Sequence, residues 1–147
     1  MLSDAQISIE FEKPDRPGLI DLLPLADIAF FSNTYFKHYQ YGDSDISTPE
    51  EFLACMRRRN PTAILILTAG ADGAYYSSAG EVSRIAASQV DVMDSTGAGD
   101  TFIAGFIWAF GRLKKGLKES VELAVQLATR KVIQEGFEGV WERLGTL

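Results

Sequence analysis

Nine consecutive residues in the second half of the chain combine glycines with acids in a pattern that suits phosphate chemistry. They run from Asp94 to Phe102 and read DSTGAGDTF. Gly97, Ala98 and Gly99 carry no side chain larger than a methyl group, so their backbone amides can approach a ligand closely. Amides at the start of a helix lack partners within the helix and attract anions, including phosphate. The run therefore predicts an anion-binding turn at a helix start.

Asp100, which directly follows the three small residues, has two interpretations. A carboxylate is favourable at the positive end of a helix, so Asp100 could be a structural capping residue. A fixed negative charge beside an anion site also suits a general base that accepts a proton from a nucleophile. The residues alone leave both open.

Spacing excludes two familiar glycine motifs. A Walker A loop needs a lysine after its last glycine, and none follows Gly99. A dinucleotide-binding G-x-G-x-x-G fingerprint needs a third glycine where Phe102 stands. An acidic phosphate-binding turn remains.

Two elements must position this turn. The β-like run from Ser88 to Met93 predicts a strand leading into it, and the unbroken apolar run from Thr101 to Phe110 predicts a helix leaving it. That helix is apolar on nearly every side, which predicts burial. It has about half of the roughly 20 residues that are needed to cross a bilayer. Gly105 within it predicts close packing against a neighbour.

The rest of the chain alternates strand and helix patterns, which predicts an α/β fold with parallel strands. Thr48, Pro49 and Glu51 form a capping-box helix start. The fully apolar run from Ala63 to Leu67 predicts the central strand. The other expected elements are strands at Ile7–Glu12, Asp27–Phe31, Tyr75–Ser77 and Glu81–Ala86, a short helix at Leu19–Leu25, a helix ending near Asn60 and a long amphipathic helix at Gly116–Glu135 with Gly136 as its cap.

Three further features have alternative interpretations. Gly70 and Gly73 lie between two expected strands and suit a turn. The arginines 57–59 could bind an anion, but a solvated last helical turn matched to the helix dipole is the favoured interpretation. His38, the single histidine, could contact a ligand, and we favour a surface position because no partner has recognisable spacing.

Composition narrows the class of protein. The 147 residues make one domain's worth of chain, and 46% of them are hydrophobic, enough for a buried core. A formal net charge of −6 disfavours a nucleic-acid partner. The single cysteine fits a reducing compartment. We expect a soluble, cytoplasmic protein with no membrane association, because no long apolar run or signal-peptide pattern is present.

The run DSTGAGDTF resembles the second signature of the ribokinase-like (PfkB) carbohydrate kinases, D-T-x-G-A-G-D-x-F. The resemblance implies that Asp100 is the general base that deprotonates a sugar hydroxyl. It also implies that the amides of Gly97, Ala98 and Gly99 form an anion hole for the transferring phosphoryl group.

Other positions extend the resemblance. Thr68, Gly70 and Gly73 match a T-x-G-x-x-G-A loop that lies along the nucleotide in this family. Ala128 and Val132 would line the adenine pocket, although both also suit a plain core. The segments Glu12-Lys13-Pro14, Ile28–Ser32 and Gly136–Val140 are similar to the ketohexokinase branch.

The resemblance implies a ribokinase-like three-layer α/β/α fold with a mostly parallel sheet, of which residues 1–147 form the C-terminal half. It implies ATP and Mg²⁺ as cofactors. Many relatives have an N-x-x-E motif that organises magnesium, but here Phe36 replaces the glutamate after Asn33, so no protein metal ligand is assigned. Magnesium would be held by nucleotide phosphates and water.

The expected activity is transfer of a phosphoryl group from ATP to a sugar hydroxyl, with a ketohexose such as fructose as the acceptor. One alternative is a nucleotide-binding or assembly module that has no activity alone, either self-associating as a homo-oligomer or requiring the missing N-terminal half. A second is a nucleoside or vitamin kinase of the same family.

Overall fold

The computed structural model describes residues 5–42 and 45–142. The chain divides into two compact units. Unit 1 comprises residues 1–70 and 74–84, and unit 2 comprises residues 71–73 and 85–147. Each unit is described by itself.

A five-stranded sheet forms the framework of unit 1, and its order is β1-β2-β3-β4-β5. The pairs β1–β2 and β2–β3 are parallel, whereas β3–β4 is antiparallel. The expected central strand is confirmed, because β3 occupies the middle position and its apolar residues Leu65, Ile66 and Leu67 are fully buried. The strands are β1 (Ser8–Phe11), β2 (Ile28–Phe31), β3 (Ile64–Thr68), β4 (Ala74–Ser77) and β5 (Ser83–Ile85).

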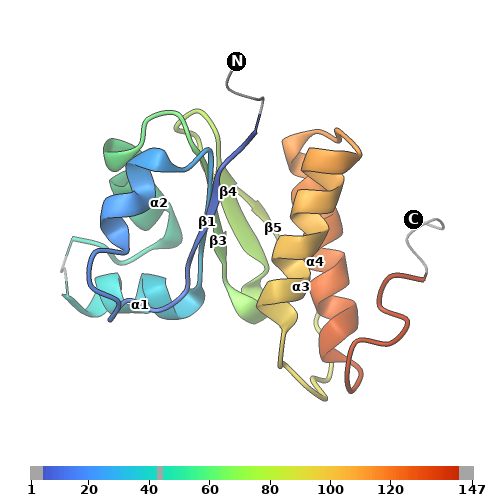
Figure 1. Cartoon of the computed structure of the whole chain (residues 1–147). Coiled ribbons are helices and arrows are strands. Elements are labelled where there is room, and N and C mark those ends of the chain that lie inside the picture. The colour runs from blue at the N-terminus through green and yellow to red at the C-terminus, as the bar shows by residue number, and fades with distance from the viewer. Residues whose placement is uncertain (1–4, 43–44, 143–147) are drawn as a thin grey trace. The chain divides into compact units, whose positions relative to one another are not determined.

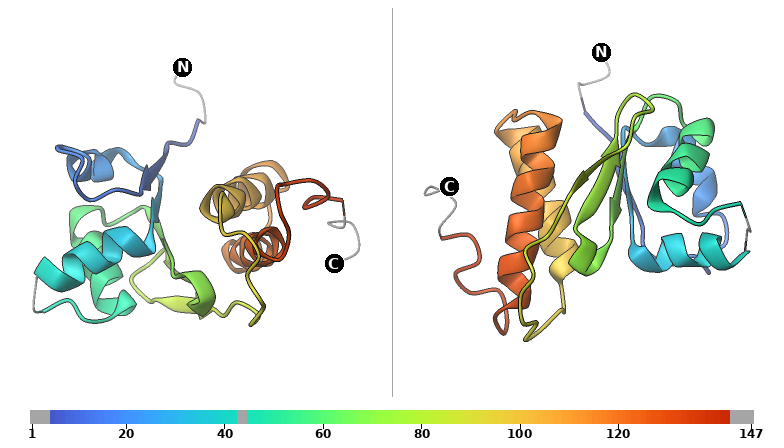
Figure 2. Two further views of the ribbon diagram at one scale, coloured as in Figure 1. Left: turned by 90° about the horizontal axis from the view of Figure 1, so that it is seen from below. Right: turned by 180° about the vertical axis from the view of Figure 1, so that it is seen from behind.

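Three helical segments of unit 1 lie on one face of this sheet (Figures 1 and 2). They are the 3₁₀ helix η1 (Ile20–Leu25), α1 (Asn33–Gly42) and α2 (Pro49–Arg59). The capping box at the start of α2 is confirmed: the Thr48 hydroxyl accepts the Glu51 amide, and the Glu51 carboxylate accepts the Thr48 amide. The short helix over Leu19–Leu25 is also present, and it is 3₁₀ with Pro24 inside it.

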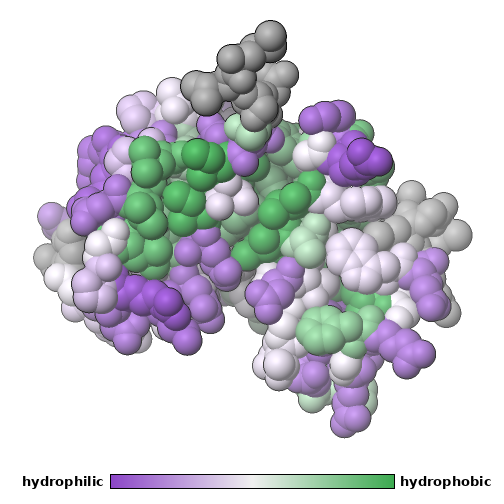
Figure 3. All heavy atoms as spheres, in the orientation of Figure 1, coloured by the Kyte–Doolittle hydropathy of each residue, from purple (hydrophilic) through white to green (hydrophobic). Residues whose placement is uncertain are grey.

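Aromatic rings fill the core between this sheet face and its helices. Phe31 of β2 stacks on Phe11 of β1 at 4.9 Å between ring centroids and meets Phe52 of α2 edge-on at 5.2 Å. Such offset and edge-to-face pairs add modestly to the burial of apolar area. Not all apolar residues of unit 1 are inside. Figure 3 shows apolar side chains at the surface over η1, where Leu22 and Leu25 are exposed.

Arg57 corrects the prediction for the arginines 57–59. Arg57 is half-buried, and its guanidinium group donates to the carbonyl oxygens of Pro61, Ala63 and Ser77. It thereby fastens the end of α2 to β3 and β4, and burial lowers the pKa of Arg57. Because both of its terminal nitrogens donate to other parts of unit 1, Arg57 is also a poor candidate for an anion site.

Unit 2 contains an irregular segment followed by two helices. The strand expected from Ser88 to Met93 is wrong: these residues have no regular structure, and Val92 and Met93 are exposed. The apolar alternation is present in the sequence, but a strand also needs a hydrogen-bonded ladder partner. This segment makes only isolated contacts, among them the Met93 amide on the Val132 carbonyl at 2.7 Å.

The two helices of unit 2 are α3 (Ala98–Phe106) and α4 (Leu117–Val132), which run antiparallel side by side (Figures 1 and 2). A π-helical segment, η3 (Ile107–Arg112), continues from α3. The close packing expected at Gly105 is confirmed, because an added Cβ there would lie 2.6 Å from Leu127 Cδ1.

Two sequence predictions for these helices need correction. The helix expected from Thr101 to Phe110 is not buried all round, since Ile107 and Trp108 are exposed. The long helix ends at Val132 rather than at Glu135, and Gly136, with φ 66°, lies beyond its C-cap residue Ile133. None of the helices within residues 5–42 and 45–142 is both long and apolar enough to span a membrane.

Candidate functional site

A left-handed glycine makes the turn into α3. Gly97 is the N-cap residue with φ 75°, a conformation that costs an L side chain about 1–2 kcal/mol. The turn is closed by the amide of Thr101, which donates to the Gly97 carbonyl at 2.9 Å, and by the Thr101 hydroxyl, which donates to the same oxygen at 2.8 Å. The chain therefore enters the helix in one defined geometry.

The predicted anion-binding amides differ in their bonding. The amide of Ala98 already donates to the Ser95 carbonyl at 3.2 Å. The amides of Gly99 and Asp100 belong to the first helical turn, which has no intrahelical acceptor to offer them. The helix start therefore presents amide donors from Gly99, which was predicted, and from Asp100, which was not.

Asp100 lies in this first turn with its side chain exposed. A proton acceptor must be reachable by the group that loses the proton. Exposure meets that requirement, whereas a carboxylate sealed in the core would have excluded the role. The assignment of Asp100 as general base stays a prediction.

The loop before the turn is organised by Asp94. One carboxylate oxygen, Oδ1, accepts the Thr96 amide at 2.9 Å. The other, Oδ2, accepts Lys131 Nζ at 2.9 Å, and the same ammonium group donates to the Asp94 carbonyl oxygen at 3.1 Å. These bonds, with the one from Lys131 first, hold the pKa of Asp94 well below its usual range. The loop therefore carries an ionised carboxylate across the ordinary pH range.

Lys131 is a functional candidate that sequence reasoning missed. Its side chain is 0% exposed, and its Nζ lies 5.1 Å from the centroid of the Phe137 ring. A signal was present in the sequence: Lys131 follows Ala124 by seven residues and Leu127 by four, so it lies on the apolar face of α4. A lysine on such a face needs a partner, and 37 residues separate it from Asp94.

The Phe137 ring also contacts the glycine turn. A Cβ added at Gly97 would lie 2.4 Å from Cζ of that ring. Phe137 therefore leaves room only for glycine there and touches both the turn and Lys131. It too was missed, having been noted only as part of the Gly136–Val140 segment.

The predicted nucleotide-loop residues fall in both units, which are described separately. In unit 1, Thr68 ends β3 and its hydroxyl donates to the Phe31 carbonyl at 3.3 Å, while Gly70, with φ 59°, begins the 3₁₀ turn η2 (Gly70–Asp72). In unit 2, Gly73 has φ 92°, and an added Cβ would lie 2.0 Å from the Ile85 carbonyl oxygen. Backbone packing is thus sufficient to explain a glycine at position 73, and its nucleotide role stays a prediction.

Ala128 and Val132 lie on α4 and are half-buried. The backbone carbonyl of Val132 accepts the amides of Met93 and Asp94. The structure therefore brings Val132 next to the loop that precedes the glycine turn. Partial exposure is compatible with both interpretations of these two side chains, adenine contact and core packing.

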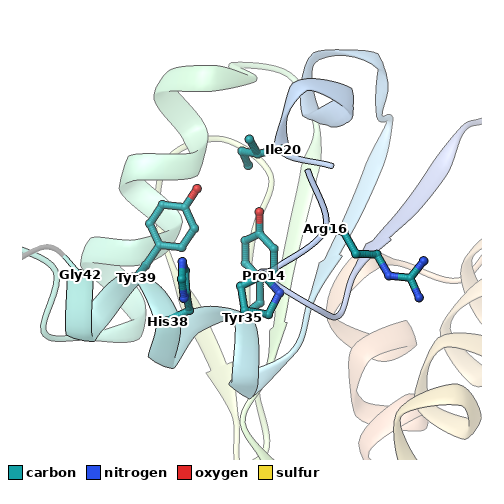
Figure 4. Close-up of a pocket in the computed structure, with 7 residues that line it drawn as sticks. All are labelled: Pro14, Arg16, Ile20, Tyr35, His38, Tyr39 and Gly42. Carbon is teal, nitrogen blue, oxygen red and sulfur yellow. The ribbon is translucent and has the colours of Figure 1, made fainter. Parts of the chain in front are cut away.

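Unit 1 has a separate pocket of about 290 Å³ near α1. Tyr35, His38 and Tyr39 of α1 line it together with Pro14, Arg16, Ile20 and Gly42 (Figure 4). Burial, followed by the neighbouring Tyr39, raises the pKa of Tyr35 above its ordinary value. His38 is exposed, which confirms the favoured surface position, and it also borders this tyrosine-lined pocket.

Acidic, histidine and cysteine side chains within residues 5–42 and 45–142 form no cluster of three or more that could hold a metal ion.

Comparison with known proteins gives one family. The family model described as pfkB family carbohydrate kinase matches residues 9–141. Among curated proteins, the chain is 28% identical over 141 residues to a ketohexokinase of Mus musculus, covering 92% of this chain and 44% of that one. It is 26% identical over 144 residues to an adenosine kinase of Schizophyllum commune, covering 89% and 42%. The chain thus spans less than half the length of these relatives.

A solved structure, assigned as ribokinase II of E. coli in complex with ATP and Mg²⁺, matches with a TM-score of 0.65 at 28% identity. The match covers 81% of this chain and 37% of that one. The α/β fold with a mostly parallel sheet is therefore confirmed as part of the ribokinase fold.

Proposed function

The chain belongs to the pfkB family of carbohydrate kinases. On that premise we propose that it supplies the part of an ATP-dependent sugar kinase that binds the phosphoryl donor and carries the general base. The acceptor we propose is a ketohexose such as fructose. The observation that carries the proposal is the start of α3, where an exposed Asp100 follows the left-handed Gly97 turn.

In the proposed reaction the carboxylate of Asp100 accepts the proton of the acceptor hydroxyl. The oxygen then forms a bond to the γ-phosphorus of ATP as the bond to the ADP oxygen breaks. The first-turn amides of α3 stabilise negative charge on the phosphoryl oxygens, a role for which preorganised backbone donors are suited. In such reactions positioning and electrostatic stabilisation account for most of the rate enhancement.

Nucleotide binding completes the proposal. Thr68, Gly70 and Gly73 would lie along the nucleotide, and Ala128 and Val132 would contact the adenine. ATP fits a start of α3 that presents amide donors and no bulky side chain. The described residues form no acidic cluster for a metal, so Mg²⁺ is expected on the nucleotide phosphates and water. Bound there, it would neutralise charge on the phosphates.

The test compares Asp100→Asn with a matched variant, Asp91→Asn, which changes an exposed aspartate outside the glycine turn. ADP release from MgATP would be measured with fructose, ribose and adenosine as acceptors. Loss of a general base costs typically about 10²–10⁴-fold in rate. We therefore expect Asp100→Asn to lose at least a hundredfold in kcat while Asp91→Asn stays within twofold. Turnover of Asp100→Asn within a fewfold of wild type rejects the base role.

Two alternative functions can be tested in the same assays. The first alternative is a nucleotide-binding or assembly module that has no kinase activity by itself. In that case calorimetry detects MgATP binding, and no acceptor elicits ADP release. The adenosine kinase similarity favours a nucleoside acceptor, and faster ADP release with adenosine than with fructose would support it.

A further inference from the structure

Two residues contact the turn that presents the first-turn amides of α3: Lys131, a buried residue in the last turn of α4, and Phe137, which lies beyond the end of that helix. Lys131 bonds to both the carboxylate and the backbone carbonyl of Asp94. The Phe137 ring packs on Gly97 and lies beside the Lys131 ammonium group. Lys131 therefore contacts the segment from Asp94 to Gly97 at its first residue, and Phe137 contacts it at its last. The two side chains also contact one another.

We propose that Lys131 and Phe137 are positioning residues that act as a clamp, fixing the Gly97 turn and with it the amides at the start of α3. The inference rests on the proposed function only in taking this turn to bind phosphate. The clamp itself is a statement about its conformation.

The charge arrangement supports a specific role for the lysine rather than general packing. A fully buried ammonium group must be compensated, and here a carboxylate, a carbonyl and an aromatic face surround it. Asp94 uses its second carboxylate oxygen for the Thr96 amide, so the position of Lys131 is transmitted directly to the backbone of the turn. Removing the ammonium group frees Asp94 to rotate toward solvent, since its side chain is already 29% exposed.

The glycine explains why the second residue is an aromatic ring. Gly97 needs its left-handed conformation to aim the chain into α3, and a flat ring can approach a residue that has no Cβ. The ring is 54% exposed, so burial of its apolar surface does not explain its position. Its contacts with Gly97 and Lys131 explain that position.

The clamp makes a prediction that can be measured without enzyme activity. Three amides report on the turn, those of Thr96, Ala98 and Thr101, because each donates a hydrogen bond within it. In Lys131→Met we expect their hydrogen exchange to accelerate at least tenfold. The matched control is Lys118→Met on the same helix, whose exposed lysine forms a 3.7 Å pair with Glu122 and which should leave the three amides unchanged.

Rescue separates positioning from packing. Lys131→Ala removes the cation and leaves its partners in place, so ethylammonium added to this variant should slow the exchange again, whereas an equal concentration of sodium should not. Lys131→Arg, which retains a cationic donor, should keep exchange within about threefold of wild type. If Lys131→Met does not fold, Phe137→Leu provides the same comparison from the exposed side of the clamp.

The outcomes separate this inference from the proposed function. Exchange in Lys131→Met that equals Lys118→Met, or a Lys131→Ala variant that ethylammonium does not rescue, overturns the clamp. Accelerated exchange with rescue supports it. Calorimetric titration with MgATP is then read independently: we expect affinity at least fivefold weaker in Lys131→Met than in Lys118→Met. Loosened amides with unchanged MgATP affinity uphold the clamp and count against phosphate binding at this turn.

Discussion

Replacing Gly97 by alanine tests the geometry of the turn through stability alone. Alanine in the left-handed conformation costs about 1–2 kcal/mol. Its Cβ would also lie 2.4 Å from the Phe137 ring, which must move away. A displaced ring loses its interaction with Lys131, which we take as about 0.5–1 kcal/mol because the Phe137 ring, unlike the buried ammonium group, is 54% exposed. We therefore expect the free energy of unfolding of unit 2 to fall by about 1.5–3 kcal/mol.

The chain contains a selective probe for this experiment. It has two tryptophans, Trp108 and Trp141, and both lie in unit 2, where their rings meet edge-on at 6.3 Å. Tryptophan fluorescence during urea unfolding therefore reports on unit 2. With a slope of about 1–3 kcal/mol per molar urea, the midpoint should fall by roughly 1 M.

A double-mutant cycle separates the two causes. In a Phe137→Ala background the ring is absent, so Gly97→Ala should cost only the backbone part, and the coupling between the two sites should be about 0.5–1 kcal/mol. Gly111→Ala is the matched control, because an added Cβ there meets nothing within 4 Å. An unchanged midpoint for Gly97→Ala would show that residue 97 is not left-handed, and the clamp would lose its second contact.

The remaining predictions concern other sites. Gly73 and Gly80 both have positive φ, but only an alanine at position 73 meets backbone, at Ile85, so Gly73→Ala should destabilise by at least about 2 kcal/mol more than Gly80→Ala in thermal melts. Hydrogen bonds from Ser47 and Thr48 lower the pKa of Glu51, so its carboxylate stabilises the fold above pH 4.5; this stabilisation is lost as the pH falls through the folded pKa, and urea titrations of Glu51→Gln should lack that dependence. Met56→Ala, at a fully buried position of α2, should cost about 2–5 kcal/mol by chemical denaturation followed by circular dichroism.

Features set by neighbouring residues were predictable from the sequence. The helix start at Thr48 follows from spacing, because the hydroxyl and the carboxylate of Glu51 can satisfy each other's amides within one turn. The apolar run that became β3 is likewise local, since a strand covered on both faces needs continuous apolar residues. A helix after the glycine turn was predicted for the same reason, but from Thr101, whereas α3 begins three residues earlier at Ala98.

Features that depend on distant partners were not predictable. Residues 88–93 have the alternation of a strand, but pairing requires a neighbouring strand, which no local pattern supplies. The Lys131–Asp94 pair joins residues 37 positions apart, so even a lysine on an apolar face could not name its partner. The same holds for Phe137, whose contact with Gly97 becomes visible only in three dimensions.

The sheet order has a consequence for how the protein acquires its structure. β3 and β4 are adjacent in sequence and pair antiparallel, whereas β1, β2 and β3 are joined by long crossovers and pair in parallel. Closing a short loop loses less chain entropy than closing a long one, and non-local pairing is slow. We therefore expect the β3–β4 hairpin to nucleate the sheet. During synthesis on the ribosome, β1 and β2 would then emerge before the hairpin on which they pair has formed. Nascent chains that lack β4 would therefore be the species most prone to aggregate.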